Sequence, residues 1–358
     1  MASHVVCTSR DLLPLVLQYQ AGVFEDLLPY FHARYYRGFY AKDASKSALH
    51  MAIARRKPGI VARLFRCVPH LFNTDAMDLA ASFGHLDVVR VLHDLGCSCS
   101  TSAMDAASQA GFLDVVDFLH THRTEGCTRF ALNAALRDGN VEMAAFLLAH
   151  RHEGCSAEAI DHVAWHGQLR LLQLLHEHDA AGFSHRTMDF AAGGGHLPVV
   201  AFLHEHRHEG CSVDAMNDAA RRGYLPVVAF LHAMRSEGCT TDAMDDAASN
   251  GHLDVVRFLH SHREEGCTTD ALDLACRHGF LDVAMFLHTY RREGCTANAL
   301  LDAVAHGHTD VVSYLCQQRL PQCNVSAALD LAKDRGLHAM VACLSCPVPA
   351  AVAPRAAS

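Results

Sequence analysis

Cysteine and histidine recur together in this sequence at a spacing that could bind metal. Seven of the 15 cysteines occupy one position of an internal repeat. They are Cys99, Cys127, Cys155, Cys211, Cys239, Cys267 and Cys295. Two histidines precede three of them at the spacing H-x-H-x4-C, as His260 and His262 precede Cys267. Thiolate and imidazole are the ligands that structural zinc prefers, so a metal-binding array is one interpretation of the pattern.

Comparison among the copies favours a buried, apolar role for these cysteines. Phe72 and Phe183 occupy the same position in two other copies, and phenylalanine cannot bind a metal. The position directly precedes a helix N-cap in most copies, so its side chain can pack on the residue four past the cap as a hydrophobic staple. We expect no disulfides between copies, because packed helices lie about 10 Å apart, beyond the reach of the bond.

The element that positions these residues is a repeat of about 28 residues, of which Cys239 to Gly266 is one copy. Its fixed marks are Gly84, Gly111, Gly139, Gly167, Gly195, Gly223, Gly251, Gly279, Gly307 and Gly336, which are 27 to 29 residues apart. In this copy Thr240 is placed to cap a first helix that Gly251 ends in a left-handed conformation. Gly266 is expected to stop a second helix, whose buried face includes Phe258.

Eleven such repeats can be recognised between residues 46 and 344. The first, Ser47 to Phe65, has Arg56 in place of the turn glycine. Two short helices with close connections in every copy predict an α-solenoid, in which each repeat buries its apolar face on its neighbours.

The repeat motif A-x-x-x-A-A-x-x-G-H-L-D-V-V-x-F-L-H resembles the ankyrin repeat, over residues 46 to 340. Ankyrin repeats usually have 33 residues, so about five are missing here from the connecting β-hairpin. The resemblance implies an all-α solenoid of about eleven ankyrin-like helix-turn-helix repeats with reduced or absent β-hairpin fingers. It also implies a protein-binding function.

One polar position of the first helix departs from the ankyrin pattern. Later repeats carry an acid or amide where the first repeat has His50. These residues are Asp78, Asp105, Asn133, Asp161, Asp189, Asn217, Asp245 and Asp273. We expect their side chains to hydrogen-bond first-turn amides or amides of the neighbouring repeat. A histidine of the second helix, such as His232 or His260, is expected to be half-buried between helices.

The two ends of the chain do not fit the repeat. Residues 1–45 are predicted to form an N-terminal helical cap. Their leucine and proline content also resembles an F-box loosely, which would make the protein a substrate receptor of a ubiquitin ligase. Residues 345–358, rich in proline and alanine, are predicted to be a disordered C-terminal tail.

Composition narrows the class of partner. The formal charge of −9 argues against binding to nucleic acid, which needs a dense basic surface. No run of about 18 apolar residues predicts a membrane span, and Arg10 and Asp11 interrupt any signal peptide. We therefore expect a cytoplasmic or nuclear monomer.

We expect the functional residues at the repeat positions where the residue type differs between copies. Ser, His and Asp recur once per repeat, as structural residues do, so no catalytic set and no cofactor are predicted. The variable positions of the first helices should form the concave surface of an interaction scaffold or adaptor. The predicted partner-binding residues are His162, Trp165, His166, Phe190, Asp218, Arg221, Arg222, Asp246, Asn250, Arg277 and His278. Trp165 is the only tryptophan, and Gly193 and Gly194 are expected to open a groove beside it.

Overall fold

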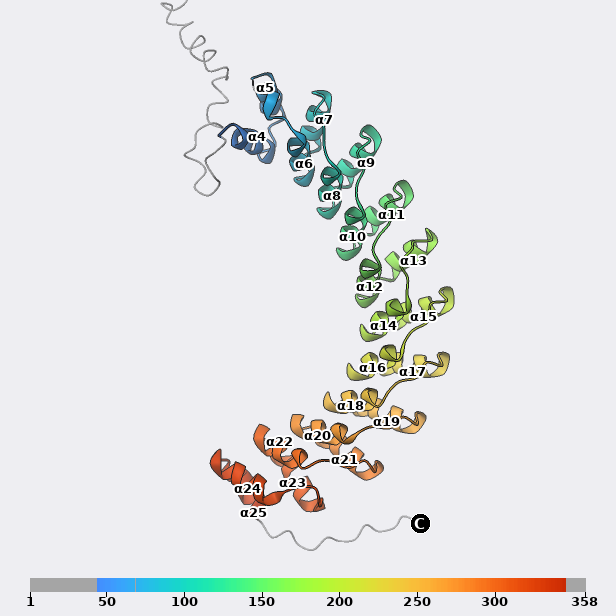
Figure 1. The fold of residues 1–358 in the computed structure, drawn as a ribbon, viewed down its shortest axis with the longest axis vertical. Coiled ribbons are helices and arrows are strands. Elements are labelled where there is room, and N and C mark those ends of the chain that lie inside the picture. Colours follow the sequence, from blue (N-terminus) through green and yellow to red (C-terminus); the bar gives the residue numbers. More distant parts are fainter. Residues whose placement is uncertain (1–43, 68, 346–358) are drawn as a thin grey trace, which may run out of the picture. The chain divides into compact units, whose positions relative to one another are not determined.

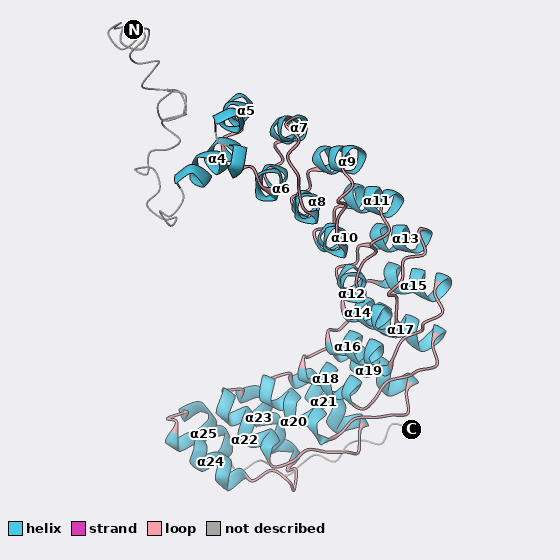
Figure 2. Cartoon of the chain, turned by 45° about the horizontal axis from the view of Figure 1, so that its top comes forward, coloured by secondary structure: helices cyan, strands magenta, loops and turns pink. Residues whose placement is uncertain are grey.

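The computed structural model describes residues 44–67 and 69–345. These residues form 22 α-helices and no strands (Figures 1 and 2). The helices pair along the chain into eleven two-helix repeats, and a short 3₁₀ helix, Pro69–Leu71, follows the first pair. The all-α repeat fold is thus confirmed, and in the described residues the β-hairpin fingers are absent.

The first helices of the repeats are α4 (Ala44–Ala54), α6 (Thr74–Ser82), α8 (Thr101–Gln109), α10 (Arg129–Arg137), α12 (Ala157–Trp165), α14 (His185–Gly193), α16 (Val213–Arg221), α18 (Asp242–Ser249), α20 (Thr269–His278), α22 (Asn298–His306) and α24 (Val325–Asp334). The second helices are α5 (Pro58–Cys67), α7 (Leu86–Asp94), α9 (Leu113–His122), α11 (Val141–His150), α13 (Leu169–Glu177), α15 (Leu197–His206), α17 (Leu225–Met234), α19 (Leu253–His262), α21 (Leu281–Tyr290), α23 (Thr309–Gln318) and α25 (His338–Ser345).

The predicted ends of the chain lie almost wholly outside the described residues. Of the predicted cap at residues 1–45, the structure describes Ala44 and Ser45, which begin α4. Of the predicted tail at residues 345–358, it describes Ser345, which ends α25. The hypothesis of an F-box-like adaptor also falls on residues outside the described part.

The chain divides into two compact units. The N-terminal unit contains residues up to Ala159 and residues 173–182, and the C-terminal unit contains residues 160–172 and everything from Phe183 onward. Within each unit, successive first helices pack side by side on one face and successive second helices pack on the other (Figure 1). In the C-terminal unit the first helices contact one another more extensively than the second helices do.

The core lies between the paired helices and their neighbours in the next repeat. Val255, Val256 and Leu259 of α19 are at most 1% exposed, as their helical spacing predicts. Phe258 was expected on the same buried face but is only half-buried. Its ring packs edge-to-face on His232 of the preceding repeat, with ring centroids 5.6 Å apart. This contact confirms that the histidine of the second helix packs between repeats.

A carboxylate clamp joins the first helices of successive repeats. The Oδ1 atom of Asp245 in α18 accepts a hydrogen bond from the Thr268 backbone amide at 2.8 Å, and Oδ2 accepts one from the Thr268 hydroxyl at 2.7 Å. Thr268 in turn caps α20, because its Oγ1 accepts the amide hydrogen of Asp270 at 3.1 Å. The clamped side chain is almost buried, at 7% exposed.

The same clamp recurs along both units. Asp78, Asp105, Asp189 and Asp273 each bind the amide and hydroxyl of the next cap, whereas Asn217 exchanges hydrogen bonds with Thr240. The predicted hydrogen bonding of this position to the neighbouring repeat is therefore confirmed. In most repeats the predicted Ser or Thr N-cap also accepts a first-turn amide hydrogen.

Glycine has two different roles in the repeat. Gly251 has φ +78° after α18 and makes the left-handed turn that was predicted. Arg56 adopts φ 53° at the same position of the first repeat. Gly266 does not stop the second helix, because α19 already ends at His262 with the chain extended at Arg263. Gly266 instead makes a second left-handed turn, with φ +77°, in the loop between repeats, where it lies beside Arg291 of the next repeat.

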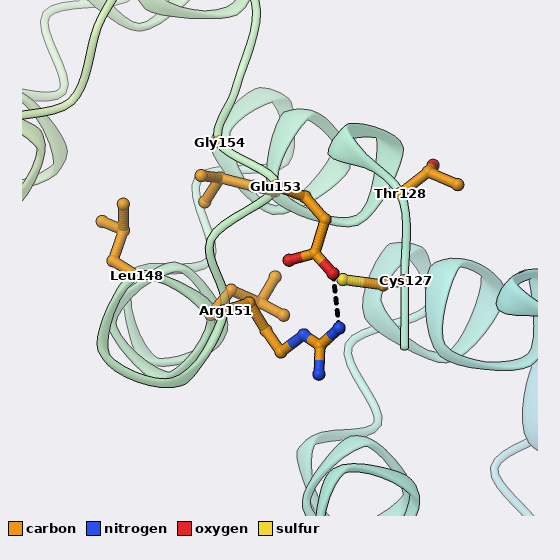
Figure 3. Close-up of a pocket in the computed structure, with 8 residues that line it drawn as sticks. Cys127, Thr128, Leu148, Arg151, Glu153 and Gly154 are labelled. Atoms are coloured by element: carbon orange, nitrogen blue, oxygen red, sulfur yellow. Dashed lines mark hydrogen bonds and ion pairs between the residues drawn. The ribbon is translucent and has the colours of Figure 1, made fainter. Parts of the chain in front are cut away.

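That arginine belongs to an ion pair that the sequence analysis missed. In six repeats an Arg directly after the second helix pairs with a Glu two residues later, and the next two residues are Gly and Cys. Figure 3 shows the Arg151–Glu153 pair beside the sulfur of Cys127, which begins the same repeat. Glu237 likewise accepts the Cys211 amide hydrogen at 3.4 Å. The R-x-E-G-C spacing is visible in the sequence, but only the structure shows that the pair lies against the cysteine that begins its own repeat and, through its arginine, beside the last glycine of the preceding one.

We predict that Asp245→Ala lowers the free energy of unfolding by about 1–3 kcal/mol, because it leaves the Thr268 amide without its acceptor. Asp245→Asn should cost less, since Asn217 fills the same position in the preceding repeat. Urea denaturation measures both, with Glu264→Ala at an exposed position as control. Equal stability of Asp245→Ala and the control would show that the clamp does not stabilise the stack.

We also predict an acid-dependent loss of stability through the Arg–Glu pairs. Partial burial opposes the shift, but the hydrogen bond from Arg235 lowers the pKa of Glu237 from 4.5 to about 2. A carboxylate with a lowered folded pKa stabilises the fold above its unfolded pKa and loses that contribution as the pH falls from about 4.5 to 2. Glu237→Gln should therefore flatten the fall in unfolding free energy over this range.

Two measurements make that prediction specific. Burial raises the pKa of Asp245 and Asp273, so these two carboxyls stabilise the fold as the pH falls, opposite to Glu237. Both proteins contain them, so the difference between the wild type and Glu237→Gln at each pH isolates the effect of Glu237. Glu205→Gln, at an exposed position, is the control and should follow the wild type. Identical pH profiles for all three proteins would contradict the prediction.

Candidate binding surface

All the predicted partner-binding residues lie on the first helices α12 to α20 or directly after them, in the C-terminal unit. They occupy three positions of the repeat, which are the middle of the helix, its last turn and the residue before the turn glycine. His166, Arg221, Arg222, Asn250, Arg277 and His278 are exposed, and the other five are half-buried. The structure divides them into several local groups.

The first group is an aromatic pair formed by Trp165 and Phe190. Their ring centroids are 6.0 Å apart and the rings meet edge-to-face at 79°. A Cβ atom at Gly193 would lie 3.1 Å from Cζ3 of Trp165, and one at Gly194 would lie 2.4 Å from the Trp165 carbonyl oxygen. The predicted open groove beside Trp165 is therefore wrong, because the tryptophan itself occupies the space that the two glycines leave.

Two arginines cover this aromatic pair. The guanidinium carbon of Arg222 lies 4.5 Å from the centroid of the Trp165 ring, although Arg222 follows α16 and Trp165 ends α12. Arg186 lies 5.4 Å from the Phe190 centroid and 3.8 Å from the carboxylate of Asp161. A cation over an aromatic face gains about 0.5–1 kcal/mol where it is exposed. The pair and its two arginines are called the Trp165 cluster below.

A second group lies beside the Trp165 cluster. Arg221 forms an ion pair with Asp218 three residues earlier in α16. The Asp218 Cβ atom would be 3.3 Å from a Cβ at Gly193, so this group borders the indole. Burial raises the pKa of Asp246 on α18, while the nearby Arg221 opposes that shift. Arg221 is thus balanced by two carboxylates.

Other contacts of the predicted residues lie within one repeat or join it to the adjacent repeat. His162 and His166 lie side by side on α12, with ring centroids 4.1 Å apart. The Nδ1 atom of His278 donates to the Ser249 carbonyl at 2.7 Å, and Asn250 donates to the Asp246 carbonyl at 2.8 Å.

Sequence reasoning missed Arg186 and the packing role of Gly193. Arg186 precedes Phe190 by four residues, a helical spacing that predicts contact between the two side chains. Nothing in the local sequence signals that Gly193 supports the indole of another repeat. That role depends on how α14 packs against α12.

The cysteine position has the features of a buried thiol. Cys127 and Leu132, the residue four past the Thr128 cap, line the same small cavity of about 20 Å³, as a hydrophobic staple requires. Burial raises the pKa of the Cys127 thiol to about 11. Burial does the same for Cys155, Cys211 and Cys267. Within residues 44–67 and 69–345, no group of three or more His, Cys, Asp and Glu side chains is placed to hold a metal ion.

One cysteine pair departs from the spacing expected between repeats. Cys295 and Cys323 occupy equivalent positions in adjacent repeats, and both are free thiols. A hydrogen bond between their sulfurs, aided by burial, raises the pKa of Cys295, and the same bond lowers that of Cys323. The side chains of these two repeats approach more closely than the interhelix spacing suggested.

We predict slow alkylation of the cysteines at this position in the folded protein. A thiol with a pKa of about 11 holds little thiolate at pH 7.5, and the thiolate is the nucleophile. Iodoacetamide labelling with peptide mass spectrometry should show Cys127, Cys211 and Cys267 modified at least about tenfold more slowly than in urea. Equal rates in the folded and unfolded protein would contradict their burial.

The comparisons agree with this architecture. The structure defines a class of protein, the helical repeat proteins, and residues 244–328 match the family model of ankyrin repeats in three copies. The match runs from α18 into α24, and the remaining helix pairs of the described residues form the same kind of helical repeat. Ankyrin repeats are protein-binding modules. No curated protein sequence matches the chain. No helix of the described residues is long and apolar enough to cross a membrane.

Proposed function

We propose that the protein is a non-enzymatic scaffold or adaptor that binds another protein through the first-helix surface of its C-terminal unit. The observation that carries the proposal is the stack of Arg222 on Trp165, which spans the repeat between them. Trp and Arg are the residues most enriched among those that dominate binding energy at protein interfaces. The stack needs Trp165, the only tryptophan, so it is not part of the repeating framework.

The absence of an enzymatic role is part of the proposal. The side chains that could act as catalysts are largely engaged in contacts that recur from repeat to repeat. Asp245 clamps Thr268, and His232 packs on Phe258. A catalytic set would bring such groups together once, beside a cleft that binds the substrate.

Three further features belong to the same proposal. The array of residues 46–344 is the interaction domain, residues 1–45 cap it, and residues 345–358 are a tail. The protein acts as a monomer in the cytoplasm or nucleus, and it does not bind nucleic acid. Deletion of residues 1–45 separates a cap from an adaptor of ubiquitin transfer, because loss of a cap lowers solubility and loss of an adaptor removes one specific partner.

We predict that Arg222→Ala weakens partner binding by roughly 5- to 30-fold, the effect of losing about 1–2 kcal/mol at an interface. Binders are first selected from a displayed library of random peptides on the wild-type protein, and their affinities are then measured for each variant. Arg221→Ala should have a smaller effect, because Asp218 already pairs with this side chain.

The control for this experiment is Arg257→Ala. Arg257 is exposed and lies 5.7 Å from the Phe286 ring, so it makes the same type of stack on the second-helix face of the same unit. Trp165→Ala should also reduce binding, but its thermal unfolding must be measured, because the indole packs on Phe190 and Gly193. Selected peptides that bind all the variants equally would place the binding surface elsewhere.

A further inference from the structure

One position of the repeat is basic or neutral throughout the C-terminal unit, although the whole chain has a formal charge of −9. It is the residue before the turn glycine, at the C-terminal end of each first helix. Its members are His166, Gly194, Arg222, Asn250, His278, His306 and Arg335. All except Gly194 are exposed. In the N-terminal unit the same position holds Arg55, Phe83, Ala110 and Asp138, so a basic residue is not required by the repeat.

Helix capping accounts for most of this basic column. Basic groups at a helix C-terminus bind its free carbonyl oxygens and offset its dipole. His278 donates to the Ser249 carbonyl at 2.7 Å and Arg335 to the Ala305 carbonyl at 2.6 Å. His166 and His306 contact carbonyls of their own helices at 2.9 Å. These contacts fix the side chains at the ends of the first helices.

Arg222 does not fit this explanation. It stacks on the indole of Trp165, two first helices away, instead of binding a helix carbonyl. Among the described residues it forms no ion pair, whereas its neighbour Arg221 is paired with Asp218. It is therefore the arginine of the Trp165 cluster that is not ion-paired, because Arg186 lies near Asp161.

A guanidinium held over an aromatic ring is preorganised to bind a carboxylate. The indole takes one face of the planar group and limits its rotation, while the N–H donors along its edge can still bind two oxygens at once. The exposed acids of the first turns lie in another row. Asp214, Asp242 and Asp270 are in the first turns of α16, α18 and α20, about a helix length away from the basic column. Closer to the column are Asp218 and Asp246, which are half-buried near Arg221, and Asp334, which directly precedes Arg335.

We propose that the basic column binds an extended acidic segment of a partner protein, with one carboxylate held by Arg222 on Trp165. This inference rests on the proposed function and names the chemistry of the partner. Packed helices are about 8–10 Å apart, and a peptide in the extended polyproline II conformation rises about 3.1 Å per residue with three residues per turn, so every third side chain lies on one face. Acidic side chains at every third position would therefore meet successive repeats, from His166 through Arg222 to His278.

The first test measures binding of defined peptides to the full chain at pH 7.5. The probe is a fluorescein-labelled peptide of five Asp-Gly-Ser triplets, and binding is read as fluorescence anisotropy and, with the unlabelled peptide, as a change in the emission of Trp165. Two control peptides are used. In one, Lys replaces every Asp, and in the other the composition is the same but the five Asp residues are contiguous. The triplet peptide should bind at least about tenfold more tightly than the Lys peptide, and more tightly than the contiguous one. Its affinity should fall as salt rises.

Variants decide whether Arg222 holds the carboxylate. Arg222→Gln should weaken the triplet peptide about tenfold or more, and Arg222→Lys should give an intermediate loss, because lysine keeps the charge but not the planar fork. Arg257→Gln, the matched stack on the opposite face, should bind as the wild type does. The inference is overturned if the triplet peptide does not bind, if Arg222→Gln binds it as well as Arg257→Gln does, or if a 15-nucleotide single-stranded DNA binds more tightly.

The random-peptide selection separates this inference from the proposed function. If the selected peptides need Arg222 and are rich in Asp and Glu, both are supported. If they need Trp165 or Arg222 but carry no excess of acidic residues, the surface binds protein and the acidic-segment inference is wrong. If no selected peptide depends on these residues, the proposed surface itself is wrong.

Discussion

The carboxylate clamp between first helices is the interaction on which the rest of this structure depends. A two-helix repeat cannot bury its own apolar face, so it must stack, and stacking by apolar contact alone would leave the register between repeats loosely fixed. Asp245 fixes it, because its two oxygens bind both the amide and the hydroxyl of the Thr268 cap. The residue that begins one helix is thereby held by the helix before it.

The Arg–Glu pairs and the buried cysteines form a second set of recurring contacts, in the loops that connect the repeats. The Arg151–Glu153 pair lies against Cys127, which begins the same repeat (Figure 3). Residues that looked like a set of metal ligands thus serve packing, the cysteines within a repeat and histidines such as His232 between repeats. Because these contacts recur with the period of the sequence, they explain why so many histidines, cysteines and acids are present without requiring a separate function for each.

Departures from the framework are concentrated around Trp165. Gly193 and Gly194 interrupt the side chains of α14, the indole fills that space, and Arg222 reaches across to stack on it. This arrangement replaces the ordinary capping contact at one first helix with an exposed cation that, among the described residues, forms no ion pair. A repeat protein that binds another protein needs such a local exception, since a uniform surface would offer no fixed position to a partner.

The sequence by itself determined the fold of the repeats. The regular glycines, the Ser and Thr caps and the apolar spacing such as Val255, Val256 and Leu259 are local signals, and each acts through contacts inside one repeat or with its immediate neighbour. For the same reason, the sequence predicted that the side chain at the position of Asp245 hydrogen-bonds to an amide of the first turn or of the neighbouring repeat. The sequence also indicated candidate functional positions, because comparison of the repeats with one another shows which positions vary.

Only the tertiary structure decided how the exceptional residues meet. Trp165 and Arg222 are 57 positions apart, and the repeat between them has no side chain at Gly193. The sequence suggested an open groove there, but the packing of α14 against α12 lets the indole fill it. That contact depends on the exact offset between stacked repeats, which local spacing does not specify. The covering of Cys127 by Arg151 lies within one repeat, but it escaped prediction because it joins the two ends of the repeat, 24 positions apart.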